Sequence, residues 1–136
     1  MTELTWRLDR HALEQGASVA VMFALPFGVA AAIVSNERRG LAAVLAVLAL
    51  IGLLLGAGVA AWRQDRGTPY THGLLTAVGV FVVIQAIGVV RRLAAGDPLH
   101  GSRIVSGLLL SAFAGIVGGL MGSWAIKPSG DEGWRR

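Results

Sequence analysis

Residues 40–62 read GLAAVLAVLALIGLLLGAGVAAW and contain no Asp, Glu, Lys or Arg. About 20 apolar residues in a helix cross the roughly 30 Å hydrocarbon core of a bilayer, so this stretch predicts a membrane span. Three further windows, at residues 15–36, 67–90 and 104–126, are equally free of charge. The 12 Lys and Arg and the 8 Asp and Glu residues all lie outside these windows, whereas helices of a water-soluble domain each need a polar face. The sequence therefore predicts an integral membrane protein.

The expected fold class is an all-α membrane protein, with four transmembrane helices in an up-down bundle that forms one domain over residues 1–136. The predicted spans are residues 17–34, 41–62, 73–90 and 104–126. A link as short as Asn36–Gly40 makes the first two spans antiparallel neighbours. Met1–Glu14 has apolar residues at helical spacing with charges between them, which predicts a short N-terminal interfacial helix. Residues 91–103 are expected to form the longest loop, and residues 127–136 a flexible tail.

Glycine makes up 19 of the 136 residues, about twice its usual share. Small residues matter in lipid because they let helix backbones approach closely where apolar burial does not drive helices together. The second and fourth spans each place small residues along one side, as a groove. The residues expected to pack helices there are Gly52, Gly56, Ala60, Ser111, Gly115, Gly118 and Gly122.

Polar groups inside the spans are few. Gln85 is the only amide well inside a span, and Thr76 lies further along the same helix. A buried amide needs a partner where water is absent, and either an interhelical hydrogen bond or a ligand or water pathway supplies one. Pro26 predicts a bend in the first span, either a packing kink or a broken helix of the transporter kind. Gln85, Thr76 and Pro26 are thus the candidate polar or ligand-binding residues.

Basic residues gather at the span ends, an arrangement that favours contact with lipid phosphates over nucleic acid. The candidate headgroup contacts are Arg91, Arg92, His100 and Arg103, in a loop that is either solvated and lipid-facing or able to hold a phosphate. His72 and His100 are expected at opposite membrane faces, as interfacial caps or headgroup contacts.

The residues that several kinds of transport and catalysis require are absent from the sequence. The chain has no cysteine, and no ionisable Asp, Glu, Lys or Arg lies inside a predicted span, which argues against proton- or cation-coupled transport. It also contains no Gly-Lys-Ser/Thr phosphate loop, no His-Glu-x-x-His and no Gly-x-Ser-x-Gly. The sequence therefore predicts a protein that is not an enzyme, with no catalytic residue, cofactor or metal site.

The distribution of basic residues gives an orientation. The N-terminus, the second link and the tail hold seven Lys or Arg, and the opposite side holds five. By the positive-inside rule both termini are expected in the cytoplasm. Arg dominates over Lys, and together with abundant Ala, Gly, Val and Leu this composition suggests a bacterium of high GC content. A multi-pass protein of the bacterial inner (plasma) membrane is predicted.

Three segments of the sequence are similar to those of a known group of proteins. They are Gly52-Leu-Leu-Leu-Gly56-Ala-Gly58-Val-Ala-Ala-Trp62, then Pro69-x-x-His72-Gly73, then Gly115-Ile-Val-Gly118-Gly119-Leu-Met-Gly122. The stretch from Gly52 to Ile126 resembles small four-span integral membrane proteins of unknown function that are common in actinobacteria. The resemblance implies four spans and no particular activity.

Two functions are compatible with these observations. The first is helix–helix association, as a homo-oligomer or as an accessory subunit of a membrane complex, because a four-helix bundle can use one glycine groove internally and leave the other available. The second is a dimeric transporter or channel for a small or lipidic solute, with Gln85, Thr76 and Pro26 along its path. In either case the lipid bilayer is a partner and nucleic acid is not.

Overall fold

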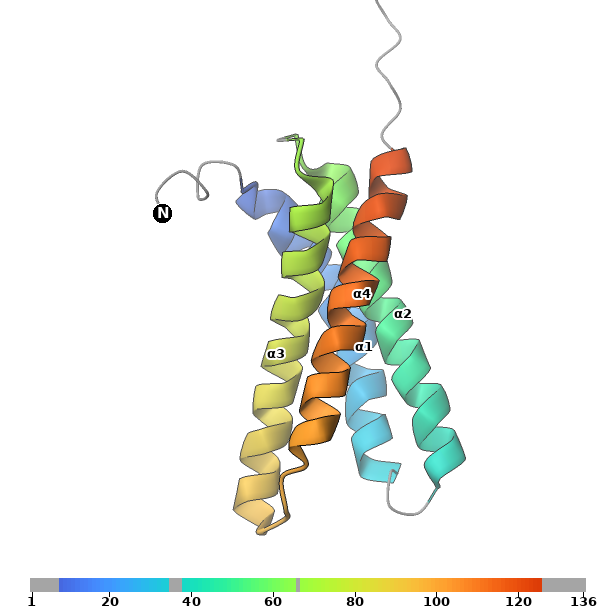
Figure 1. The fold of residues 1–136 in the computed structure, drawn as a ribbon, viewed down its shortest axis with the longest axis vertical. Coiled ribbons are helices and arrows are strands. Elements are labelled where there is room, and N and C mark those ends of the chain that lie inside the picture. Colours follow the sequence, from blue (N-terminus) through green and yellow to red (C-terminus); the bar gives the residue numbers. More distant parts are fainter. Residues whose placement is uncertain (1–7, 35–37, 66, 126–136) are drawn as a thin grey trace, which may run out of the picture.

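The computed structural model describes residues 8–34, 38–65 and 67–125. They form four helices: α1 (Arg10–Val34), α2 (Arg39–Arg63), α3 (Pro69–Ala95) and α4 (Gly101–Ala125). Each helix is long and apolar enough to cross a membrane. The expected all-helical fold with four membrane-spanning-capable helices is confirmed. Successive helices run in opposite directions along the long axis of the molecule (Figure 1).

The helices extend past the predicted spans into charged sequence. Residues 10–14 belong to α1 itself, while residues 1–7 of the expected interfacial helix and the tail at 127–136 lie outside the described residues. The expected loop over residues 91–103 is wrong, because Arg91 and Arg92 belong to α3 and Arg103 to α4. The charges of these residues favour a loop outside the bilayer, but Arg is also a good helix former. The helix ends instead at Ala95, where the following Gly96 closes α3 with a φ of 72° and N–H bonds to the carbonyl oxygens of Arg92 and Leu93.

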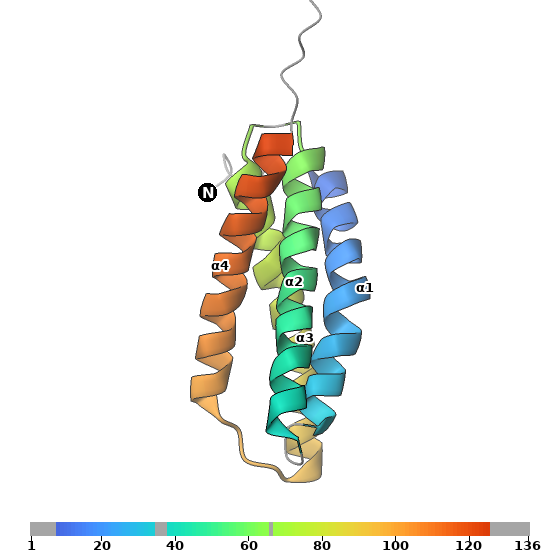
Figure 2. The same cartoon turned by 90° about the vertical axis from the view of Figure 1, so that its right-hand side faces the viewer.

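The four helices form a bundle with two central and two outer members. α2 and α3 each contact all the other helices, whereas α1 and α4 do not touch within the described parts of the chain. Figure 2 shows α4 and α1 on either side of the α2–α3 pair. α2 therefore packs against α4, a helix that runs in the same direction, as well as against its antiparallel neighbours.

Tight packing is confined to one half of this bundle. Every buried residue that the structure describes lies in residues 12–24 of α1, residues 52–63 of α2 with the adjoining Gln64, residues 72–80 of α3 or residues 111–122 of α4, which we call the closed half. Residues 28–34, 39–50, 84–95 and 101–110 form the open half, and none of those described there is buried. α2 and α4 diverge toward the open half in both views (Figures 1 and 2).

Glycine brings the backbones into contact in the closed half. A Cβ added to Gly16 of α1 would lie 2.6 Å from the carbonyl oxygen of Gly56 in α2. A Cβ on Gly118 of α4 would lie 2.5 Å from the carbonyl oxygen of Leu54, and one on Gly73 of α3 would lie 2.5 Å from that of Gly115. Real Cβ atoms essentially never come within 3.0 Å of another heavy atom in this way, so each of these helix pairs depends on glycine.

A buried histidine ties the start of α1 to the start of α3. The side chain of His72 is fully buried, and its Nε2 accepts the backbone N–H of Asp9 at 2.8 Å. Because a backbone N–H is always a donor, Nε2 carries no proton, and Nδ1–H donates to the carbonyl oxygen of Thr68 at 2.9 Å. The Asp9 carboxylate accepts the N–H groups of His11 and Ala12 and so caps α1. His72 therefore acts inside the protein and does not contact headgroups.

Replacement of Gly118 by alanine should destabilise the bundle. The added Cβ would meet the Leu54 carbonyl oxygen and the Ala57 Cβ at 2.5 and 2.8 Å, and such overpacking costs about 1–3 kcal/mol. Gly79→Ala is the matched control, because nothing lies within 4 Å of its Cβ position and alanine is the better helix former. Unfolding of both variants in mild detergent, followed by circular dichroism, measures the difference. Equal stability of the two variants would contradict the close α2–α4 contact.

Replacement of His72 by leucine should also lower stability. The backbone N–H of Asp9 loses its imidazole acceptor in a part-buried position, and a donor left unsatisfied away from water costs about 1–3 kcal/mol. His11→Leu is the control, since His11 is exposed and its side chain bonds only that of Gln15 among the described residues. The same unfolding measurement should show a lower midpoint for the His72 variant alone; an unchanged midpoint would mean that the contact with Asp9 adds nothing to stability.

Candidate functional site

The open half contains a cavity of about 580 Å³ to which all four helices contribute. This volume falls within the range of about 300–1,000 Å³ found for small-molecule sites. Its floor is the hydrophobic core of the closed half, at Ala24, Leu53 and the adjoining Phe81. Its walls combine larger apolar side chains, such as Leu50 and Ile84, with a set of small ones: Gly28, Ala31, Ala32, Ala42, Ala43, Ala46, Ala49 and Gly88. Side chains this small cannot fill the space between helices that diverge, so the cavity follows directly from the sequence of the walls and the spread of the helices.

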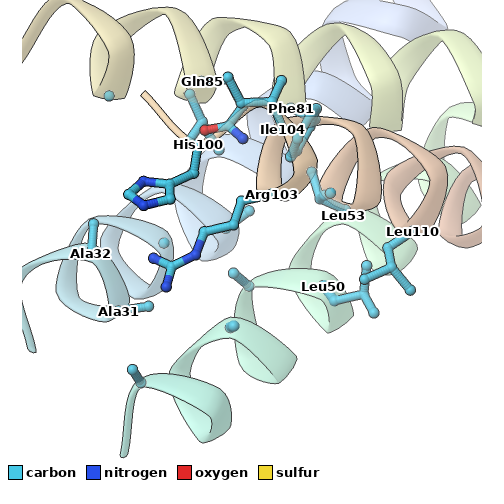
Figure 3. Close-up of a pocket in the computed structure, with 18 of the residues that line it drawn as sticks. Ala31, Ala32, Leu50, Leu53, Phe81, Gln85, His100, Arg103, Ile104 and Leu110 are labelled. Atoms are coloured by element: carbon cyan, nitrogen blue, oxygen red, sulfur yellow. The ribbon is translucent and has the colours of Figure 1, made fainter. Parts of the chain in front are cut away.

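Gln85 of α3 is a polar group on this otherwise apolar wall. The side chain is half-buried and lines the cavity, and its Nε2 lies 3.8 Å from the Cβ position of Gly107 in α4. It forms no hydrogen bond with any residue that the structure describes, so the expected interhelical hydrogen bond is not made there. Figure 3 shows the amide among the residues that face the cavity. Its donors and acceptor are therefore available to a molecule in the cavity.

Four basic or titratable side chains line the cavity where the helices reach the end of the open half. Arg39 begins α2, Arg92 lies in the last turn of α3, His100 immediately precedes α4, and Arg103 lies in the first turn of α4. In Figure 3 the side chains of His100 and Arg103 point toward the α1 residues Ala31 and Ala32. Within the described residues none of the three arginines forms an ion pair, and Asp97 is the one acidic residue at this end. The cavity thus has apolar walls and a cationic rim.

The predicted headgroup residues are only partly brought together. Arg92, His100 and Arg103 line the cavity, whereas Arg91 is exposed and does not. Arg39 was missed by the sequence reasoning. Its signal was present in the Arg38-Arg39 pair at the start of the second span, but which of the two faces inward depends on how α2 is rotated.

The other two candidate polar residues lie elsewhere. Thr76 is buried in the closed half, one turn after His72, and its Oγ1 has no hydrogen-bond partner among the described residues. Pro26 is exposed on α1, which continues through it as a single helix to Val34. Neither residue lines the cavity, so Gln85 is the one member of the expected trio that does.

The small residues expected to pack helices are all buried, but they serve different neighbours. Gly52, Gly56 and Ala60 face α1, where Gly16, Ala20 and Ala24 were not anticipated as partners. Gly118 and Gly122 face α2, and Gly115 faces α3. The hydroxyl of the buried Ser111 donates to the carbonyl oxygen of Leu108 at 2.8 Å. Both expected grooves are therefore occupied within one chain, and the premise that one of them remains available is wrong.

The sequence offered a signal for the missed α1 partners. Ala12, Gly16, Ala20 and Ala24 recur at steps of four and are the buried residues of α1. Such spacing aligns small residues on one helix face. In α3 the pair Gly73 and Ala77 has the same spacing and packs on Gly115 of α4.

The described residues contain no group of three or more His, Cys, Asp or Glu side chains placed to hold a metal ion. The features that distinguish the site are thus shape, apolar walls and positive charge. Comparison with known proteins adds no assignment: no protein-family model, no curated protein and no solved structure matches the chain.

Proposed function

We propose that the protein binds a membrane lipid, with an acyl chain in the cavity of the open half. The observation that supports this function is the apolar cavity of about 580 Å³, formed at one end of helices that are apolar enough to lie in a bilayer. The proposal takes the four helices as an up-down transmembrane bundle. With both termini in the cytoplasm of a bacterium, the cavity would open in the outer leaflet of the plasma membrane.

The cavity supports the lipidic-solute version of the transporter or channel hypothesis. The closed half lies between the cavity and the other end of the bundle, and its helices touch through backbone atoms at Gly16, Gly56 and Gly118. A continuous pore along the axis of one chain would have to pass through these contacts. Binding, or carriage of a lipid between this cavity and the bilayer, is therefore the better fit.

Helix–helix association with a second copy or with another membrane protein stays a prediction. Its original support was an unused glycine groove, and both grooves are filled by helices of the same chain. Substitutions at Gly118 or Gly122 would disturb the α2–α4 contact within the chain, so they cannot report on an oligomer. The mass of the wild-type protein in native mass spectrometry reports on it directly.

Replacement of Ala46 by phenylalanine should displace the lipid. Ala46 lines the cavity, and a phenyl group there would occupy space needed by an acyl chain. Val44→Phe is the matched control, because Val44 is exposed on the same helix and does not line the cavity. Native mass spectrometry of protein released from mild detergent should show one retained phospholipid for the wild type and for Val44→Phe, and several-fold less for Ala46→Phe.

Two results would contradict the proposal. One is equal lipid retention by the two phenylalanine variants, which would place the lipid on the outer surface. The other is a wild type that carries no lipid and instead has the mass of a dimer, which would make a second copy the occupant of the cavity.

A further inference from the structure

We propose that the bound lipid is an anionic phospholipid whose phosphate is held by Arg39, Arg92 and Arg103 at the rim of the cavity. This inference rests on the proposed lipid-binding function and names the class of lipid. It also distinguishes a built headgroup site from the general attraction of basic residues to a membrane surface.

The three arginines come from three different helices and line one cavity. Arg39 is in the first turn of α2, Arg92 in the last turn of α3 and Arg103 in the first turns of α4. Two helices begin and two end at this rim, so helix dipoles largely oppose one another there and the side-chain charges set the sign. No described carboxylate pairs with these guanidinium groups, whose planar forks match a phosphate oxygen pair. The rim therefore carries positive charge that an anionic group would neutralise.

The polarity of the cavity lining changes with depth. The order of these changes matches the order of the parts of a phospholipid. Gln85 precedes Arg92 by seven residues of the same helix, which places it about 10 Å deeper at 1.5 Å per residue. Its amide makes no hydrogen bond with a described residue and faces the cavity. Alanine walls and the floor at Leu53 and Phe81 lie near and beyond it. Guanidinium groups, an amide and an apolar floor correspond to the phosphate, the ester carbonyls and the acyl chains.

The sequence offers matched controls for two of the three rim arginines. Arg38 and Arg91 are the immediate neighbours of Arg39 and Arg92 in the chain, are exposed at the same end of the bundle, and do not line the cavity. A nonspecific membrane attraction would depend on all five arginines alike. A built site depends on Arg39, Arg92 and Arg103 only.

The test compares two lipids with identical acyl chains, phosphatidylglycerol and phosphatidylcholine, added to the delipidated full-length protein in mild detergent. Native mass spectrometry measures the fraction of protein that retains each lipid. Phosphatidylglycerol has no choline to offset the charge of its phosphate, so the wild type, with three arginines at the rim, should prefer it at least about tenfold. The triple variant Arg39→Gln, Arg92→Gln, Arg103→Gln should lose this preference and keep its retention of phosphatidylcholine, while Arg38→Gln with Arg91→Gln should behave as the wild type.

The outcomes separate this inference from the function on which it rests. Equal retention of both lipids by the wild type, or a preference that survives in the triple variant, overturns the assignment of an anionic phospholipid to these arginines and leaves lipid binding intact. Retention of neither lipid by the wild type overturns lipid binding itself. Inorganic phosphate at millimolar concentration should not displace phosphatidylglycerol, because it lacks the chain; complete displacement would identify a free-phosphate site and overturn the phospholipid assignment.

Discussion

Close contact between helix backbones is the constraint on which the rest of this structure depends. Lipid tails are as apolar as leucine side chains, so helices in a bilayer gain nothing from burial and associate through dispersion contacts at short range. In the closed half that range is reached at glycine: Gly16 on Gly56, Gly73 on Gly115, and Gly118 on the backbone at Leu54. At the same end, the hydrogen bond from the backbone N–H of Asp9 to Nε2 of His72 joins the start of α1 to the start of α3. These contacts hold four helices at one end with few large side chains between them.

The cavity is a consequence of the same arrangement. Helices that touch at one end and diverge toward the other need large side chains to fill the widening space. In α2 the residues that line this space include Ala42, Ala43, Ala46 and Ala49, whose side chains are too small to fill it. Small residues thus allow close packing in the closed half and leave a cavity in the open half. The two halves differ in the distance between the helices.

The distribution of charge around the cavity determines which class of molecule fits it. Its walls hold Gln85 as a polar group, and the guanidinium groups of Arg39, Arg92 and Arg103 lie at its rim. An apolar interior with a cationic edge matches an amphipathic anion better than an inorganic ion or an uncharged solute.

The sequence by itself determined that the chain has four long apolar helices, because an uncharged window of 22 to 24 residues admits little else in a bilayer. It also identified most of the rim, at Arg92, His100 and Arg103, and the amide at Gln85. Only the tertiary structure decided that α2 packs beside α4, that Gly115 and Gly118 face different helices, and that Arg39 lines the cavity while Arg38 and Arg91 do not. The physical reason is that these helices are apolar on every side. A water-soluble helix shows its inward face by the contrast between apolar and polar residues. Here that contrast is missing, so the rotation and neighbours of each helix depend on small differences in backbone approach that arise only when all four helices are packed together.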